Sequence, residues 1–210
     1  MIAVTRKFSY KCIRLTLKAL FVTLFRLKVI NGTCIPQQGG VVICSNHPTY
    51  LDPLLIAVAS SRNVCFIGHV ALFSMRLIRA FLWIAECIPI KQRHPDRRAL
   101  REAIRQLRRG KVLAIFPEGH REVHGRLKDG LPGAALIAMM SKTPIVPCAL
   151  IGAYSAWPNE VSYPKPSPIT VAFGQPFYID SNQTGSREVI LKRGTNRIMT
   201  EIRELMTRFG

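Results

Sequence analysis

Acidic residues are scarce in this chain of 210 residues: 12 Asp and Glu stand against 30 Lys and Arg, which leaves a formal net charge of +18. Such an excess of positive charge indicates a partner that carries negative charge. A nucleic acid, an anionic membrane surface and a phosphorylated substrate all meet that condition. The charge therefore sets the class of partner and leaves its identity open.

Closely spaced cysteines are absent as well. The six cysteines never lie closer than ten residues apart, so the sequence has no C-x-x-C pair of the kind that binds metal or carries redox chemistry. Most of them stand within apolar runs, which favours buried free thiols in a reducing compartment over a disulfide framework. The sequence also has no G-x-S-x-G motif, and this disfavours a serine hydrolase although Ser45 stands close to His47.

The apolar N-terminal segment has no hydrophobic run long enough to span a bilayer. Its longest charge-free stretch is 19–25, far short of the roughly 20 residues that a span requires. Cations recur along it at spacings of four, three and four, at Lys7, Lys11, Arg14 and Lys18. This period predicts an amphipathic helix within residues 1–30 that lies in the membrane interface, and packing against its own domain is the alternative. The spread of the cations also disfavours a cleaved signal peptide.

Short apolar stretches alternate with helical patterns through the rest of the chain. Strands are predicted at 41–45, 63–68, 86–90, 112–116, 144–152 and 169–174. Helices are predicted at 53–61, 70–85, 96–111 and 132–141 and in the C-terminal segment. The alternation predicts a single α/β domain over residues 31–210, with a mostly parallel central sheet flanked by helices, after the basic amphipathic helix of 1–30.

Polar residues follow the first predicted strand in the segment CSNHPTYLDP, residues 44–53. Open α/β sheets place their ligand sites at this end of a strand. His47 can accept a proton near neutral pH, and a carboxylate at Asp52 can fix the tautomer of its ring. An equally simple interpretation makes Asp52 the N-cap of a helix that begins at Pro53. The spacing of the two residues does not separate these interpretations.

A second polar segment, FPEGHR at 116–121, follows another predicted strand. A glycine and an arginine at a strand end can present N–H groups and a guanidinium to a phosphate. Together the two segments resemble motifs of the glycerolipid acyltransferase family typified by 1-acylglycerol-3-phosphate acyltransferase. Asn46, His47 and Asp52 match the family's N-H-x4-D motif, Phe116, Pro117, Glu118, Gly119 and Arg121 match F-P-E-G-T-R-S, and Val146, Pro147 and Leu150 match a later apolar block.

The resemblance implies an O-acyltransferase in which His47 is the general base on the free hydroxyl of lysophosphatidic acid and Asp52 orients its ring. It implies no acyl-enzyme, no cofactor and no metal; the acyl donor, acyl-CoA or an acyl-carrier protein thioester, is a co-substrate. The product would be phosphatidic acid for phospholipid synthesis, made by a monotopic protein on the cytoplasmic face of an anionic membrane. Substrate-binding roles are implied for Asn46, Glu118, Gly119 and Arg121 and, by comparable position in the family's second motif, for Lys91 or Arg93.

Two residues depart from the family pattern and leave alternatives open. His120 and Glu122 stand where the third motif has hydroxyl residues, so the acceptor could be another lysophospholipid or a lyso-aminolipid. A noncatalytic basic module that binds a membrane surface or a nucleic acid is an alternative of another class, suggested by the arginine-rich stretch 97–111. No nucleic-acid motif accompanies that stretch, so no nucleic-acid partner is expected. The H-x3-H pair of His120 and His124 does not match the zinc pattern H-E-x-x-H.

Overall fold

The first predicted strand forms the centre of the sheet. In the computed structural model β2 (Val41–Ser45) pairs in parallel with β5 (Val112–Ile115) on one side and with β6 (Ile145–Ile151) on the other. All five residues of β2 are buried, as expected for an apolar run covered on both faces. The structure describes residues 2–70, 82, 85–90, 96–121, 126–158, 160–180 and 184–210, with side chains from residue 10 onward.

Seven strands in the order β1-β7-β6-β2-β5-β3-β4 make up the sheet. The outer strands are β1 (Lys28–Ile30), β3 (Val64–His69), β4 (Ile88–Ile90) and β7 (Thr170–Phe173). Each neighbouring pair is parallel except β6 and β7, which are antiparallel. The predicted α/β fold with a mostly parallel sheet is confirmed.

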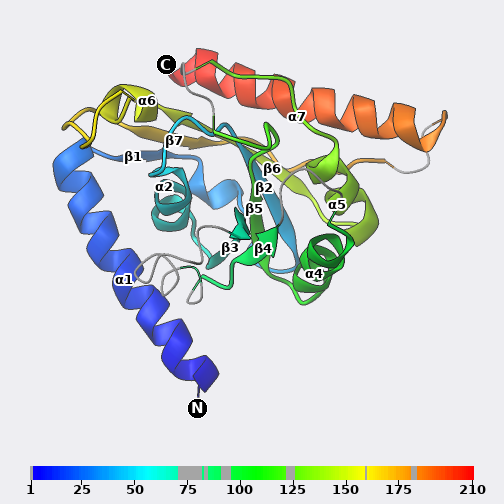
Figure 1. Ribbon diagram of the computed structural model, residues 1–210, viewed down its shortest axis with the longest axis horizontal. Coiled ribbons are helices and arrows are strands. Elements are labelled where there is room, and N and C mark those ends of the chain that lie inside the picture. The colour runs from blue at the N-terminus through cyan, green and yellow to red at the C-terminus, as the bar shows by residue number, and fades with distance from the viewer. Residues whose placement is uncertain are drawn as a thin grey trace.

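Helices cover both faces of the sheet (Figure 1). On one face lie α1 (Ile2–Phe25) and α2 (Asp52–Ala59), whose buried side chains join one hydrophobic cluster. On the other face, α4 (Arg97–Arg108), α5 (Gly133–Ser141) and α7 (Arg187–Phe209) share a second cluster. A 3-10 turn, η1 (Gly32–Cys34), and a short helix, α6 (Ala153–Ala156), complete the described elements.

The arginine-rich helix α4 follows its sequence pattern closely. Asp96 caps it by accepting the backbone N–H groups of Arg98 and Ala99 at 2.9 and 3.0 Å. Its buried side chains include Ala103 and Leu107, while most of its arginines are exposed. The helix therefore packs through one apolar stripe and presents its positive charge to solvent.

Helix α1 ends earlier than the sequence pattern suggests. It stops at Phe25, and Lys28–Ile30 forms strand β1 instead of a last helical turn. Arg26 ends the helix with a left-handed backbone, φ 46°, a conformation that glycine usually adopts at the end of a helix. Because no glycine stands at that position, the break cannot be predicted from the residue type.

The inner face of α1 packs against the domain. Tyr10, Phe21 and Phe25 are buried, and the two phenylalanine rings meet edge to face with centroids 5.5 Å apart. The Tyr10 hydroxyl accepts the backbone N–H of Val64 at 3.2 Å, and burial raises the pKa of this tyrosine. The alternative of packing against its own domain thus describes this face of the helix.

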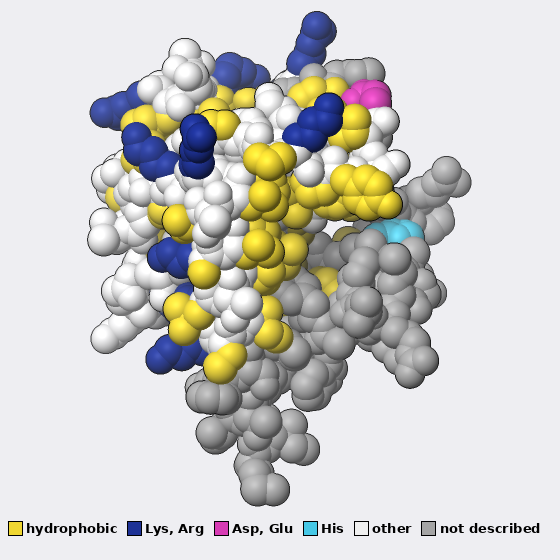
Figure 2. Space-filling view, turned by 90° about the vertical axis from the view of Figure 1, so that its left-hand side faces the viewer, with side chains coloured by type: hydrophobic (Ala, Val, Ile, Leu, Met, Phe, Trp, Pro, Cys, Tyr) yellow, Lys and Arg dark blue, Asp and Glu magenta, His cyan; other side chains and the backbone are white. Residues whose placement is uncertain are grey.

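The outer face of α1 remains apolar and exposed. Leu15, Leu20 and Val22 keep 53%, 51% and 48% of their surface in contact with solvent. On the side of the molecule that α1 occupies, hydrophobic side chains form a band with Lys and Arg beside it (Figure 2). Within the residues that the structure describes, no helix combines the length and apolarity needed to cross a bilayer.

All six cysteines are free. Cys44, Cys65 and Cys148 are buried, and burial raises the pKa of Cys65 to about 11 and that of Cys148 to about 12. These thiols are therefore protonated at neutral pH and act as small apolar side chains, as the apolar sequence around most of the cysteines indicates.

Truncation of a side chain should affect stability strongly on the inner face of α1 and little on its outer face. We expect Phe25→Ala to lower the free energy of unfolding by about 3–5 kcal/mol, because it empties a fully buried aromatic site. Leu20→Ala on the same helix is the matched control and should change it by less than about 0.5 kcal/mol. Urea unfolding followed by circular dichroism measures both, and equal losses would contradict the packing of the inner face.

Candidate active site

The two polar segments emerge side by side at one edge of the sheet. Strands β2 and β5 are parallel neighbours, and Cys44 of β2 stands opposite Ile115 of β5. Their carboxyl ends therefore meet, and the segments 46–52 and 116–121 continue from the same edge. This is the position at which open α/β sheets place ligands.

His47 and Asp52 form a hydrogen-bonded pair within the first segment. The ring Nδ1 of His47 lies 2.7 Å from Oδ2 of Asp52. The Asp52 side chain is completely buried, whereas that of His47 keeps 19% of its surface exposed. A buried carboxylate bonded to a histidine ring that is partly exposed to solvent is the arrangement that proton transfer with a bound substrate requires.

The N-cap interpretation of Asp52 does not describe the structure. Leu51 occupies the cap position of α2 without a side-chain hydrogen bond, and Asp52 is the first helical residue. Both Asp52 oxygens turn back to the loop, where Oδ2 accepts the N–H of Thr49 at 2.8 Å and Oδ1 accepts its hydroxyl at 2.5 Å. The carboxylate therefore holds the loop and the histidine ring together.

The protonation of the pair follows from these bonds. Burial raises the pKa of the Asp52 carboxyl, and the His47 ring and the N–H and hydroxyl of Thr49 oppose that rise. When the aspartate is ionised it accepts the Nδ1–H of His47, so the neutral ring carries its free lone pair on Nε2. Nε2 is thus the nitrogen that can take a proton from a substrate.

The second segment fixes the position of His47 from two sides. The Phe116 ring stacks on the imidazole with centroids 3.9 Å apart and planes 15° apart. Oε1 of buried Glu118 accepts the backbone N–H of His47 at 2.9 Å, and Oε2 accepts that of Lys128 at 3.1 Å. Glu118 therefore links the histidine loop to the chain that follows the second segment.

Asn46 ties the same loop to the other neighbour of β2. Its Oδ1 accepts the N–H of Leu150 at 2.8 Å, and its Nδ2 donates to the carbonyl of Leu150 at 3.0 Å. The side chain is buried, and it bonds to the backbone of β6 in the way that the backbone of one more residue of β2 would. These contacts give Asn46 and Glu118 positioning roles, and the substrate contacts expected of them stay a prediction.

Arg121 and Gly119 lie at the rim of the site. The Arg121 guanidinium stands 3.6 Å above the exposed ring of Tyr50, which meets Trp157 edge to face at 6.1 Å. Gly119 has φ 78°, a conformation that disfavours other residues, and this turn directs the chain from Glu118 toward Arg121. The two motifs therefore also meet at the surface, through Tyr50 and Arg121.

Several of the residues and elements predicted from the sequence lie outside the residues that the structure describes. Most of the helix predicted at 70–85 lies outside the described residues, and so do Lys91, Arg93, Glu122 and His124. His120 is described and exposed.

Thr49 and Tyr50 were not predicted as site residues, although both make contacts that shape the site. Thr49 stands three residues before Asp52, a spacing at which a side chain commonly bonds to nearby backbone, so a search for such local bonds would have found it. Tyr50 has no comparable local signal, because its partners Arg121 and Trp157 are distant in sequence.

Comparisons with known proteins give the site a family context. A family model described as Acyltransferase matches residues 26–151. The 1-acyl-sn-glycerol-3-phosphate acyltransferase of Bacillus subtilis is 28% identical over 147 residues, covering 68% of this chain and 71% of its own length. A protein of the same name from Cocos nucifera is 30% identical over 156 residues, covering 72% of this chain and 50% of its own length, so the chain spans only half of that relative.

A solved structure shares the fold. The crystal structure of the 1-acyl-sn-glycerophosphate acyltransferase of Thermotoga maritima superposes with a TM-score of 0.81 at 24% identity, covering 100% of this chain and 85% of that one. The region matched by the family model contains both β2 and β5 and therefore both polar segments.

The pairing of Asn46 with Leu150 predicts a stability cost for its removal. We expect Asn46→Ala to lower the free energy of unfolding by about 2 kcal/mol or more, because it leaves a buried N–H and a buried carbonyl without partners. Asn63→Ala, at an exposed loop position, is the matched control and should change it by less than about 0.5 kcal/mol. Urea unfolding compares the two, and a loss no larger than that of the control would contradict the positioning role.

Proposed function

This chain belongs to the acyltransferase family, and from that premise we propose that it transfers a fatty acyl group from an acyl thioester to the free hydroxyl of lysophosphatidic acid. The product is phosphatidic acid for phospholipid synthesis. The observation that carries the proposal is the 2.7 Å contact between His47 Nδ1 and Asp52 Oδ2 at the sheet edge. The names of the relatives support the choice of acceptor.

The proposed reaction is a direct transfer with one proton relay. Nε2 of His47 removes the proton of the acceptor hydroxyl while its oxygen attacks the thioester carbonyl, and Asp52 stabilises the imidazolium that forms. The tetrahedral intermediate then breaks its C–S bond, and the leaving thiolate takes the proton from His47. No acyl-enzyme forms, so holding donor and acceptor together supplies much of the rate.

The charges at the rim suit a phosphorylated acceptor. The Arg121 guanidinium offers several N–H donors to a phosphate, and its stacking on Tyr50 holds it close to the loop that carries His47. The turn at Gly119 directs the chain toward this arginine, and Lys91 or Arg93 supplies further positive charge in this proposal. Acyl-CoA or an acyl-carrier protein thioester is the proposed donor.

The outer face of α1 suits attachment to one leaflet of a membrane. Leu15, Leu20 and Val22 are exposed on the same helix as the exposed cations Lys11 and Lys18. Apolar side chains enter the interface while neighbouring cations meet anionic headgroups. We therefore propose a monotopic enzyme at the cytoplasmic face of the membrane, where the exposed apolar face of α1 would bring the site close to its proposed lipid acceptor.

Removal of the base tests the reaction. We expect His47→Ala to lower kcat for acyl transfer to lysophosphatidic acid by roughly 10²- to 10⁴-fold, the contribution of a positioned general base. The release of free thiol from acyl-CoA, with detergent-solubilised lysophosphatidic acid, measures the rate. Asp52→Asn should also reduce kcat, because it no longer accepts the Nδ1–H bond as an anion.

The same assay separates the alternatives. Equal thiol release by wild type and His47→Ala would reject the mechanism and leave a binding module without catalysis. A panel of lysophospholipids and lyso-aminolipids, with the product identified by mass, tests the acceptor. Turnover of another lysolipid in preference to lysophosphatidic acid would reject the proposed substrate while keeping the reaction.

Charged substitutions on α1 test the membrane face. We expect Leu15→Glu with Leu20→Glu to abolish binding to vesicles of phosphatidylcholine and phosphatidylglycerol, because two carboxylates replace apolar contacts. Val189→Glu with Thr200→Glu adds the same charge at exposed positions of α7, the helix on the opposite face of the sheet from α1. This variant should retain most binding. Vesicle co-sedimentation measures both, and equal loss in the two variants would count against α1 as the attachment face.

A further inference from the structure

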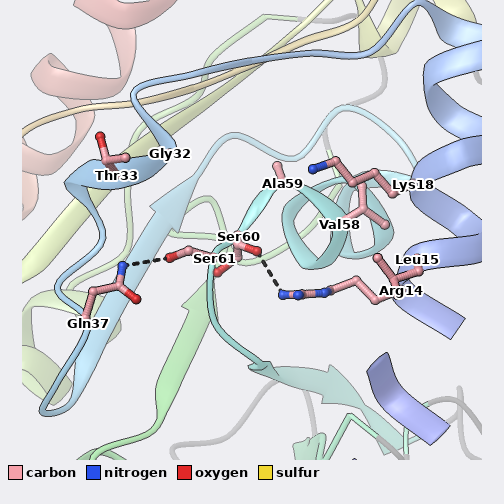
Figure 3. Close-up of a pocket in the computed structure, with 10 residues that line it drawn as sticks. All are labelled: Arg14, Leu15, Lys18, Gly32, Thr33, Gln37, Val58, Ala59, Ser60 and Ser61. Carbon is pink, nitrogen blue, oxygen red and sulfur yellow. Dashed lines mark hydrogen bonds between the residues drawn. The ribbon is translucent and has the colours of Figure 1, made fainter. Parts of the chain in front are cut away.

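A pocket of about 320 Å³ lies between α1, η1 and the end of α2 (Figure 3). It is separate from the proposed active site, because α2 begins at Asp52 and the pocket adjoins the residues that end it. From Asp52 to Val58, the first residue of α2 that lines the pocket, the helix rises by roughly 9 Å. The pocket is lined by Arg14, Leu15, Lys18, Gly32, Thr33, Gln37, Val58, Ala59, Ser60 and Ser61.

Positive charge dominates this lining. Arg14 and Lys18 stand one helical turn apart on α1, and no Asp or Glu is among the lining residues. Figure 3 shows both side chains extending from α1 toward the end of α2. The Nη1 of Arg14 donates to the carbonyl of Ser60 at 3.0 Å, which fixes the guanidinium at the pocket wall.

Complementing the end of α2 does not account for two cations. The carboxyl end of a helix carries about half a negative charge, whereas Arg14 and Lys18 carry two positive charges. A guanidinium also has five N–H donors, so its bond to Ser60 leaves donors for another acceptor. The pocket therefore retains a positive charge of more than one unit and donors able to bind an anion.

Neutral polar groups complete the lining on the side opposite α1. Gln37 donates through Nε2 to the Ser61 hydroxyl at 3.1 Å, which leaves the hydroxyl hydrogen of Ser61 available as a donor. Thr33 brings a second hydroxyl from η1, on the far side of the pocket from the two cations (Figure 3). The two cations supply the charge-assisted donors that bind a phosphate group, and these neutral groups line the pocket beyond them.

One lining residue connects the pocket to the apolar face of α1. Leu15 lines the pocket and still exposes 53% of its surface, on the same helix as the exposed Leu20 and Val22. A ligand with a charged head in the pocket could therefore lay an apolar tail along α1. Free phosphate would leave that face unused.

We propose that this pocket binds the phosphodiester headgroup of an anionic glycerophospholipid, at a site distinct from the one that holds the acyl acceptor. Arg14 and Lys18 hold the phosphate, the rest of the polar headgroup extends across the pocket to the hydroxyl of Thr33, and the acyl chains lie along Leu15 and the outer face of α1. The bound lipid anchors α1 in the interface by a specific contact in addition to general charge attraction. This inference concerns binding and stands apart from the identity of the acceptor.

Calorimetric titration of the full chain with dihexanoyl phosphatidylglycerol, kept below its micelle concentration, tests the site. We expect Lys18→Gln to weaken binding about tenfold and Thr33→Val about threefold, the loss of a charge-assisted and of a neutral hydrogen bond. Lys11→Gln removes the same charge from α1 outside the pocket lining and should weaken binding less than about twofold at physiological salt, where exposed charges are screened. These variants leave the Arg14 to Ser60 bond in place.

Two further arms identify the ligand and the place. Inorganic phosphate should bind at least about tenfold more weakly than the lipid, because it makes no contact with the apolar face. Arg121→Gln, at the rim of the proposed active site, should leave lipid binding unchanged. Equal weakening by Lys11→Gln and Lys18→Gln, equal affinity for inorganic phosphate, or loss of binding in Arg121→Gln would each overturn the proposal.

Discussion

The parallel pairing of β2 with both of its neighbours is the constraint on which the site depends. Its register sets Cys44 opposite Ile115 of β5 and Ser45 opposite Cys148 of β6. The chain that leaves β2 therefore meets Phe116 and Glu118 on one side and Leu150 on the other. A slip of one residue would turn every side chain of β2 to the opposite face and break all three contacts at once. The buried strand thus fixes the geometry of a loop that has no regular structure of its own.

Local patterns in the sequence predicted six of the seven strands, whereas the His47 to Asp52 pair was chosen over the N-cap interpretation only through the resemblance to the acyltransferase family. Apolar runs bounded by turn residues identified the central strands, and five residues across a turn suffice to bring a ring and a carboxylate together. The positioning roles of Asn46 and Glu118 could not be predicted in this way. Their partners are backbone groups of Leu150 and His47, 104 and 71 residues away, and backbone groups leave no trace in a sequence. Strand β1 was missed for a related reason. Helix α1 ends before it at Arg26, whose left-handed conformation could not be expected because the residue is not a glycine.

Helix α1 serves the domain and the solvent side with different residues. Tyr10, Phe21 and Phe25 complete the hydrophobic cluster on one face of the sheet, while Leu15 and Leu20 remain exposed. The two interpretations of the N-terminal segment, an interfacial helix and a packed helix, are therefore compatible. Each describes a different face of α1. Rigid packing of the inner side also gives the outer side a fixed orientation relative to the His47 loop. A membrane bound by that side would meet the site at a constant angle.

The burial of Asp52 explains why its carboxylate accepts several hydrogen bonds within the histidine loop. Because burial raises the pKa of this carboxyl, the folded chain holds the proton more tightly than the unfolded chain does, and stability declines as pH rises from the ordinary pKa of an aspartate toward the raised one. The N–H and hydroxyl of Thr49 offset part of that cost at all times. The His47 ring offsets more of it when it becomes an imidazolium, since a full positive charge then stands 2.7 Å from the carboxylate. The ionised carboxylate that orients the His47 ring therefore depends on these hydrogen bonds, because burial alone would favour the neutral acid.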